Sequence, residues 1–361
     1  MTHCGPSIFL DSIRLLTRFA TFLAAISLVG CASADPNLSD ALSTVDEDIP
    51  FKTGRSCFSG IRSSYDDWAA SVISKNEDAN LDTFRTRFPQ ADYDAYKKAI
   101  DCNYISYPVG DLTIRGIYVR PKDHEGEDLP VLIVNRGGNG PSGAWNLGRM
   151  FQRVLPVANA GYIVIGSQYR GSRRGDDPTV YGSDEFGGED INDVLALFDL
   201  IDRLPGADET RIGMYGWSRG GFMGLLVATK TGRLRAMVVG GTPTDLAAEL
   251  AIRPEMERVF RARIPNYDDN KNAVLEARSA VHWADSIDPD LPILILHGED
   301  DDRVSLNSAQ ELAGILRALQ HPHKLVTYEN GSHGLLERNG EVIDELVAWF
   351  GTHLVETEKR H

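Results

Sequence analysis

Three polar residues in the second half of the chain have the types and order needed for nucleophilic acyl transfer. Ser218 lies in a glycine-rich stretch, an acidic run occupies residues 300–302, and His333 comes after both. A neutral histidine can take the proton of a serine hydroxyl, and a carboxylate on its other ring nitrogen fixes the tautomer and stabilises the imidazolium. These residue types predict a serine nucleophile and a histidine base, and they leave open which of the three aspartates is the acid.

The stretch around Ser218 predicts a sharp turn between a strand and a helix. Residues 216–221 have the sequence Gly-Trp-Ser-Arg-Gly-Gly, with a short apolar run before them and a longer one after them. A Cβ atom two positions before or after the serine would clash in so tight a turn, and Gly216 and Gly220 avoid this. We expect the turn to lift the Ser218 hydroxyl out of the sheet. The same turn would leave the backbone N–H of Arg219 free to bind an oxyanion.

Apolar runs that alternate with helix-like segments must position these residues. Strands are predicted at 130–135, 162–166, 211–215, 236–241, 292–297 and 325–328, and helices at 147–160, 190–204 and 342–355. This alternation is typical of a mainly parallel sheet covered by helices on both faces, where ligands bind at the carboxyl ends of the strands. Ser218, the acidic run and His333 all follow strands, and their order is that of an α/β-hydrolase. We therefore predict an α/β-hydrolase fold.

The catalytic domain is expected over residues 104–361, after a short helical N-terminal extension at 51–103. The domain opens with a predicted hairpin, whose strands at 104–107 and 112–119 flank a Val-Gly-Asp turn. Residues 243–288 interrupt the alternation of strands and helices and are rich in charged and helix-forming residues. We interpret them as a helical insertion, or lid, over the carboxyl ends of the strands.

Composition narrows the range of partners. The chain has 37 Lys and Arg residues against 52 Asp and Glu residues, a formal net charge of -15. Nucleic acid is therefore not an expected partner, because a strongly acidic protein repels phosphates. The predicted chemistry needs no metal and no organic cofactor, and the oligomeric state is left unknown.

The first residues indicate export. Arg14 and Arg18 precede an apolar stretch that is short for a membrane span, which is typical of a signal peptide over residues 1–30. The stretch ends Leu-Val-Gly-Cys, which resembles a bacterial lipobox. The resemblance implies cleavage before Cys31, lipidation of that cysteine, and a periplasmic or outer-membrane location with membrane attachment by the lipid anchor only. An ordinary secretory signal cleaved near Ala32 or Ala34 is the alternative.

The polar, acidic residues 31–50 would then form a tether. Beyond it, Cys57 and Cys102 remain as an even pair in an oxidising compartment. We predict that they form a disulfide that closes the N-terminal extension, with two buried free thiols as the alternative.

The pattern from Arg136 to His333 resembles the catalytic domain of the prolyl oligopeptidase family of serine peptidases. The matching segments are Tyr-Arg-Gly-Ser at 169–172, Asp-Glu-Thr-Arg-Ile-Gly at 208–213, the turn at 216–221, Asp-Asp-Arg-Val at 301–304 and His-Gly at 333–334. The resemblance implies that the acid is Asp301. It also implies that Arg303 lies near the site, and we expect Arg303 and Trp217 to contact the substrate.

Two features depart from the family pattern. Members that select small peptides carry a large β-propeller before the hydrolase domain, and the roughly 70 residues between the lipobox-like sequence and the first predicted strand are too few for one. The loop that often has Tyr or His before its glycines here has Arg136, Gly137, Gly138 and Asn139. Arg136 would stabilise an oxyanion by its charge, or it would point away, pair with an acid and leave backbone N–H groups such as that of Asn139 to do so.

The leading hypothesis is a serine peptidase that acts through an acyl-enzyme on peptide substrates. A carboxylesterase with the same triad is the alternative, because the expected size filter is missing. A catalytically inactive hydrolase fold used for binding is a further alternative. Metal-dependent hydrolysis by His321, His323 and the aspartate run has poor ligand spacing.

Overall fold

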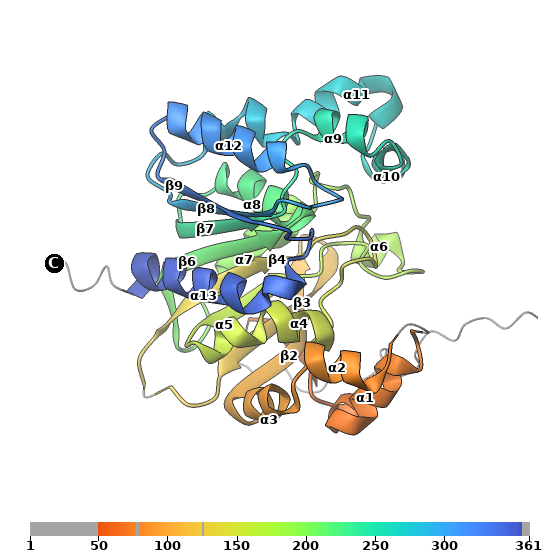
Figure 1. The fold of residues 1–361 in the computed structure, drawn as a ribbon, viewed down its shortest axis with the longest axis vertical. Helices are drawn as coiled ribbons and strands as arrows, with labels where there is room; N and C mark the ends of the chain where they lie inside the picture. The colour runs from red at the N-terminus through yellow and green to blue at the C-terminus, as the bar shows by residue number, and fades with distance from the viewer. Residues whose placement is uncertain (1–49, 77–78, 125, 356–361) are drawn as a thin grey trace, which may run out of the picture. The chain divides into compact units, whose positions relative to one another are not determined.

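The computed structural model describes residues 50–76, 79–124 and 126–355. The predicted signal peptide, Cys31 and the tether as far as residue 49 lie outside these residues. The described residues contain a nine-stranded sheet with the strand order β1-β2-β3-β5-β4-β6-β7-β8-β9. Figure 1 shows this sheet with helices packed around it.

The sheet has an antiparallel part and a parallel part. Strands β1 to β3 pair antiparallel with their neighbours, and β3 also pairs antiparallel with β5. From β5 through β4, β6, β7 and β8 to β9 every pairing is parallel. The strands are β1 (Lys52–Ser56), β2 (Ile100–Val109), β3 (Leu112–Pro121), β4 (Leu129–Asn135), β5 (Ile163–Ser167), β6 (Ala207–Trp217), β7 (Leu234–Gly240), β8 (Ile293–Gly298) and β9 (His323–Tyr328). The predicted α/β class with a mainly parallel sheet is confirmed.

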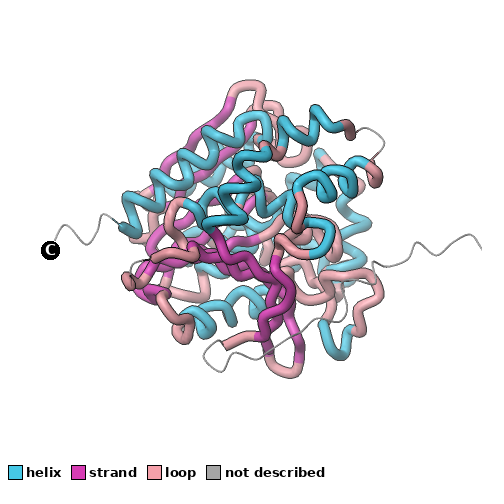
Figure 2. The backbone as a smooth tube through the Cα atoms, turned by 90° about the horizontal axis from the view of Figure 1, so that it is seen from below, coloured by secondary structure: helices cyan, strands magenta, loops and turns pink. Residues whose placement is uncertain are grey.

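Alternate residues of the central strands face two separate apolar cores. In β4, Val131 and Ile133 belong to one buried cluster and Leu132 and Val134 to the other. Helices α7 (Ile191–Ile201), α8 (Arg219–Ala228) and α12 (Leu306–Ala318) pack on the first face. Helices α4 (Leu147–Arg153), α5 (Leu155–Asn159) and α13 (Asn339–Phe350) pack on the second. Figure 2 shows the helices on both sides of the strands.

The helix predicted over 147–160 is two helices in the structure. Val154 separates α4 from α5, with φ -113° and ψ -51°. Pro156 lies in the first turn of α5 and has no N–H to donate to the preceding turn, so one continuous helix cannot form. The chain has two further helical segments. Helix α6 (Pro178–Tyr181) lies before α7, and a π-helical turn (Gly351–Val355) follows α13. No helix of the described residues combines the length and the apolar character that crossing a membrane requires.

The N-terminal extension contains α1 (Tyr65–Ile73), α2 (Leu81–Arg87) and α3 (Gln90–Ala99), and it also contributes strand β1. Its aromatic side chains pack against each other and against α4, where Trp68 contacts Phe151 at 5.8 Å between ring centroids. A disulfide joins Cys57 to Cys102 of β2, with Cα atoms 5.4 Å apart. The extension is therefore tied to the sheet by a covalent bond and by a shared apolar core.

Residues 243–288 connect β7 to β8. They form α9 (Leu246–Ile252), α10 (Met256–Arg263) and α11 (Tyr267–Glu276), followed by two short 3-10 turns. Arg278, after α11, donates through Nε to the carbonyl of Phe186 at 2.9 Å, which attaches the insertion to the segment before α7. In Figure 1 the three helices lie together at one end of the fold.

Candidate active site

Ser218 lies at the junction of β6 and α8. Its φ of 55° and ψ of -127° are unfavourable for a residue with a side chain, so the surrounding structure must hold it there. A Cβ at position 216 would lie 2.1 Å from the carbonyl oxygen of Gly220, and one at position 220 would lie 2.1 Å from that of Asn135. Glycine is required at both positions, as the sequence indicated. Residues 216–221 therefore have the strand–turn–helix geometry of a nucleophile elbow, and we call this segment the elbow.

Asp301 lies in the loop after β8, and its carboxylate is fully buried. One oxygen accepts hydrogen bonds from the backbone N–H groups of Arg303 at 2.8 Å and Val304 at 2.9 Å. The other lies 2.8 Å from Nδ1 of His333. Burial alone would raise the pKa of Asp301, but these hydrogen bonds hold it below its ordinary value. Its neighbours Asp300 and Asp302 are exposed, so the structure places Asp301 in the position of the acid.

His333 lies in the loop after β9. Two side chains bind the backbone carbonyls of that loop. The indole Nε1 of Trp217 donates to the carbonyl of His333 at 2.7 Å. The guanidinium of Arg153, which stacks 4.9 Å from the Trp217 ring, donates to the carbonyl of Gly334. We expected Trp217 to contact the substrate, but its ring nitrogen is occupied by this bond. Its position makes it a support for the histidine.

A cavity of about 230 Å³ opens beside Ser218. Ser218 and His333 both line it, although among the described residues no hydrogen bond joins their side chains. The remaining lining residues are Gly138, Asn139, Ser142, Phe186, Arg219, Pro243, Leu246, Glu249, Arg253, Met256, Phe260, Arg303 and Val304. The predicted substrate residue Arg303 is therefore at the cavity, and Trp217 is not. The insertion supplies one wall of the cavity.

The loop after β4 lies against the elbow. A Cβ at Gly137 would lie 3.3 Å from Cβ and 3.9 Å from Oγ of Ser218, so the loop backbone is within contact distance of the nucleophile. Gly138 and Asn139 line the cavity. Arg219 begins α8, where the first N–H groups have no partner within the helix. The backbones of Arg219 and of this loop can therefore supply oxyanion donors.

Arg136 does not act on the oxyanion by its charge in this geometry. Its guanidinium is buried and donates to the carbonyls of Gln168 at 2.7 Å, Ser142 at 2.9 Å and Gly140 at 2.9 Å. It donates to no carboxylate among the described residues, so the alternative of an ion pair with an acid does not hold either. Burial, with the nearby Arg219 charge, lowers the pKa of Arg136 to about 10. Arg136 instead holds the loop in shape through its carbonyls.

Several cavity residues were not foreseen. Glu249 of α9 is buried, accepts from Ser308 Oγ at 2.6 Å, and has its pKa raised by burial. Phe186 forms part of the apolar wall, and its ring meets that of Phe260 of α10 edge-on, with 5.1 Å between the ring centroids. No local sequence signal marks Phe186 or Glu249 as a cavity residue. Only the tertiary fold brings them close to Ser218.

The two histidines of the metal hypothesis have other partners. Nε2 of His321 lies 3.0 Å from the carbonyl of Asp288, and Nδ1 of His323 lies 2.8 Å from the carbonyl of His321. Within the described ranges no group of three or more His, Cys, Asp or Glu side chains is arranged to hold a metal ion.

Comparisons with known proteins show which family the chain resembles. A sequence model of the prolyl oligopeptidase family matches residues 149–357. "Uncharacterized peptidase YtmA" of Bacillus subtilis (strain 168) is 27% identical over 247 residues, which are 68% of this chain and 91% of that protein. "Uncharacterized peptidase YuxL" of the same strain is 30% identical over 268 residues, covering 69% of this chain and 39% of that protein.

A similar fold occurs in a solved structure. The acylaminoacyl peptidase of Pyrococcus horikoshii superposes with a TM-score of 0.61 at 23% identity, over 72% of this chain and 43% of that one. The chain thus spans most of the length of the first of these proteins and about two fifths of the other two.

Proposed function

The chain belongs to the prolyl oligopeptidase family, and from this we propose that it is a serine peptidase that cleaves peptides through an acyl-enzyme on Ser218. The observation that carries the proposal is the convergence of three loops on one cavity. The elbow brings Ser218, the loop after β9 brings His333, and the loop after β8 brings Asp301 to Nδ1 of that histidine.

In the acylation step, Ser218 Oγ attacks the carbonyl carbon of the scissile amide while Nε2 of His333 takes its proton. Asp301 binds the other ring nitrogen, which keeps Nε2 unprotonated before the attack and stabilises the imidazolium after it. The carbonyl oxygen becomes an oxyanion beside the backbone N–H groups of Arg219 and the loop at 137–139. His333 then gives its proton to the leaving amine as the carbon–nitrogen bond breaks.

Deacylation repeats these steps with water as the nucleophile. Water attacks the ester carbonyl of the acyl-enzyme while His333 takes one of its protons. Collapse of the second tetrahedral intermediate returns that proton to Ser218 Oγ and releases a carboxylic acid. The chain's own residues supply every proton transfer in this scheme.

The cavity favours a substrate with a bulky apolar side chain next to the scissile bond. Its apolar lining combines Phe186 with Leu246, Met256 and Phe260 of the insertion. Burying an apolar side chain there contributes about 1.5–3 kcal/mol to binding. Arg303 lines the same cavity, and its guanidinium could bind a backbone carbonyl of the peptide.

Paired reporters test the proposal. Aminoacyl amides and short acyl esters with the same apolar acyl group would be compared with wild-type protein and the Ser218→Ala variant. We expect turnover of both reporters by the wild type and neither by the variant. Ester turnover with amide release no faster than that of the variant would favour a carboxylesterase. A wild-type protein that leaves both reporters intact and resists a fluorophosphonate would refute catalysis.

We also propose that the chain is exported and anchored by acyl chains on Cys31. The lipobox-like sequence supports this, and so does the Cys57–Cys102 disulfide, because disulfides persist mainly in oxidising compartments. Mass spectrometry of protein from a bacterial membrane fraction should detect a mature N-terminus at an acylated Cys31. Cleavage near Ala32 or Ala34 without acylation would contradict the anchor and leave export standing.

A further inference from the structure

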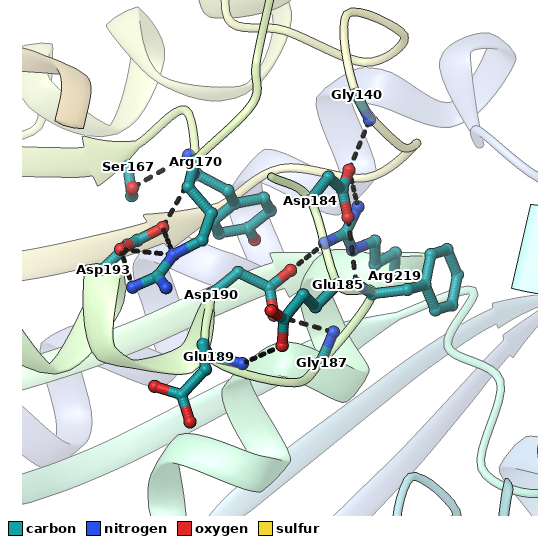
Figure 3. Close-up of polar contacts among 12 residues, drawn as sticks. Gly140, Ser167, Arg170, Asp184, Glu185, Gly187, Glu189, Asp190, Asp193 and Arg219 are labelled. Carbon is teal, nitrogen blue, oxygen red and sulfur yellow. Dashed lines mark hydrogen bonds and ion pairs between the residues drawn. The ribbon is translucent and has the colours of Figure 1, made fainter. Parts of the chain in front are cut away.

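A buried group of charged side chains lies directly behind the elbow. The guanidinium of Arg219 donates to Asp184 at 2.8 Å through Nη1 and to Asp190 through Nη2. The side chain of Arg219 is 2% exposed, and both carboxylates are fully buried. Figure 3 shows the two aspartates converging on this one arginine.

The same group reaches the loop after β4. Asp184 accepts a hydrogen bond from the backbone N–H of Gly140, on the oxygen that also receives Arg219 Nη1. Nη1 of Arg219 donates to the carbonyl of Gly138 as well, at 3.0 Å. Asp184 and Arg219 therefore connect the first residue of α8 to both sides of Asn139.

Two aromatic rings and a backbone bond fix the orientation of this group. The Arg219 guanidinium lies 5.0 Å from the ring centre of Tyr169 and 4.6 Å from that of Phe186. Asp184 also accepts from the N–H of Phe186 at 2.9 Å. Each member has several partners, so none can rotate without breaking contacts of another.

A contribution to stability does not by itself explain why this buried charged group is present. Taking several charges out of water costs free energy that their attraction only partly returns, and apolar replacements are often as stable. A buried ionic group beside catalytic donors is better explained by the geometry that it imposes. Its directional hydrogen bonds fix the distance between the groups that they join, and apolar packing fixes such a distance less sharply.

We propose that Asp184 and Arg219 are positioning residues that set the distance between the two parts of the oxyanion site, the Arg219 N–H and the backbone of residues 137–139. The inference rests on the proposed function, since it assigns a role within acyl transfer. A misplaced donor weakens binding of the transition state more than binding of the substrate, because the oxyanion exists only after attack.

The test is Asp184→Asn, which keeps the size of the side chain and removes its charge. Active sites would be counted with a fluorophosphonate, and kcat for an amide reporter expressed per labelled site. We expect kcat to fall about 10- to 100-fold, less than the loss of a whole oxyanion donor, with KM within about twofold of wild type. Affinity for a peptide aldehyde, whose hemiacetal oxygen mimics the oxyanion, should fall with kcat.

A matched control is Asp193→Asn. Asp193 of α7 is also fully buried and pairs with an arginine, Arg170, at 2.8 Å, but it contacts neither the elbow nor the loop after β4. Its loss should lower thermal stability and leave kcat per labelled site within about twofold of wild type. An equal fall of kcat in both variants would reduce the role of Asp184 to ordinary structural support and overturn the inference.

A second variant covers the case in which Asp184→Asn does not fold. Arg219→Lys keeps a positive charge near both carboxylates and removes the fork that also reaches Gly138, so it should show the same fall in kcat at constant KM. Wild-type kcat per site in either folded variant would contradict the inference and leave the proposed peptidase intact. Wild-type protein that does not react with the fluorophosphonate would refute both.

Discussion

Asp301 and its neighbours Asp300 and Asp302 differ in burial and in partners. Only Asp301 reaches His333, and its lowered pKa keeps it ionised wherever the histidine can act as a base. Asp301→Asn should lower kcat for an amide reporter about 10³- to 10⁴-fold, because the amide no longer fixes the tautomer. Asp302→Asn, at an exposed position, should stay within about twofold. Near-normal turnover of Asp301→Asn would remove that residue from the triad.

A second prediction concerns how the stability that Asp184 provides depends on pH. Burial would raise its pKa, but Arg219 and the N–H groups of Gly140 and Phe186 lower it from 3.8 to about 2. A depressed acid pKa contributes stability that is present above the ordinary value and is lost as pH falls through the folded value. The difference in unfolding free energy between wild type and Asp184→Asn should therefore be largest above pH 4 and shrink toward pH 2. Urea unfolding across that range measures it, and a difference independent of pH would contradict this prediction.

Among the elements, α10 is the helix in which a single substitution should change substrate specificity without slowing the acyl-transfer steps. Met256 faces the cavity and is remote in sequence from the triad. Met256→Trp should fill part of the space and lower kcat/KM for a phenylalanyl reporter about tenfold or more, while an acetyl reporter keeps its rate. Ile252→Trp is the control, since Ile252 is 58% exposed and does not line the cavity. Equal losses for both reporters would mean that α10 does not contact the acyl side chain.

How far the sequence predicts these elements depends on whether their residues are positioned locally. Strands β4 to β9 each contain an apolar stretch, and the elbow has its own glycine pattern, so both could be predicted. Strand β1 has the sequence Lys-Thr-Gly-Arg-Ser, with no apolar alternation, and it exists because β2 offers a free edge. Asp184 and Asp190 resemble solvated loop acids in sequence. Their partner is 35 and 29 residues away, and only the fold makes them internal.

At the scale of the whole molecule, the Cys57–Cys102 bond makes the extension part of the domain. It closes a loop with a sequence separation of 45. Its removal in the Cys57→Ser, Cys102→Ser double variant should lower the free energy of unfolding by about 2–4 kcal/mol through the unfolded state. Denaturant unfolding measures the loss, and kcat per labelled site should stay near the wild-type value below the transition. An unchanged midpoint would mean that the aromatic core alone holds the extension.

The insertion between β7 and β8 has a consequence for how this active site can change through evolution. Its residues 243–260 supply one wall of the cavity, while the proposed triad and the proposed oxyanion donors come from other loops. The strands at its two ends pair directly with each other, so their register does not depend on what lies between them. A gene segment that encodes residues 243–288 could thus be exchanged between relatives as a unit. Substrate preference would be inherited separately from catalytic power.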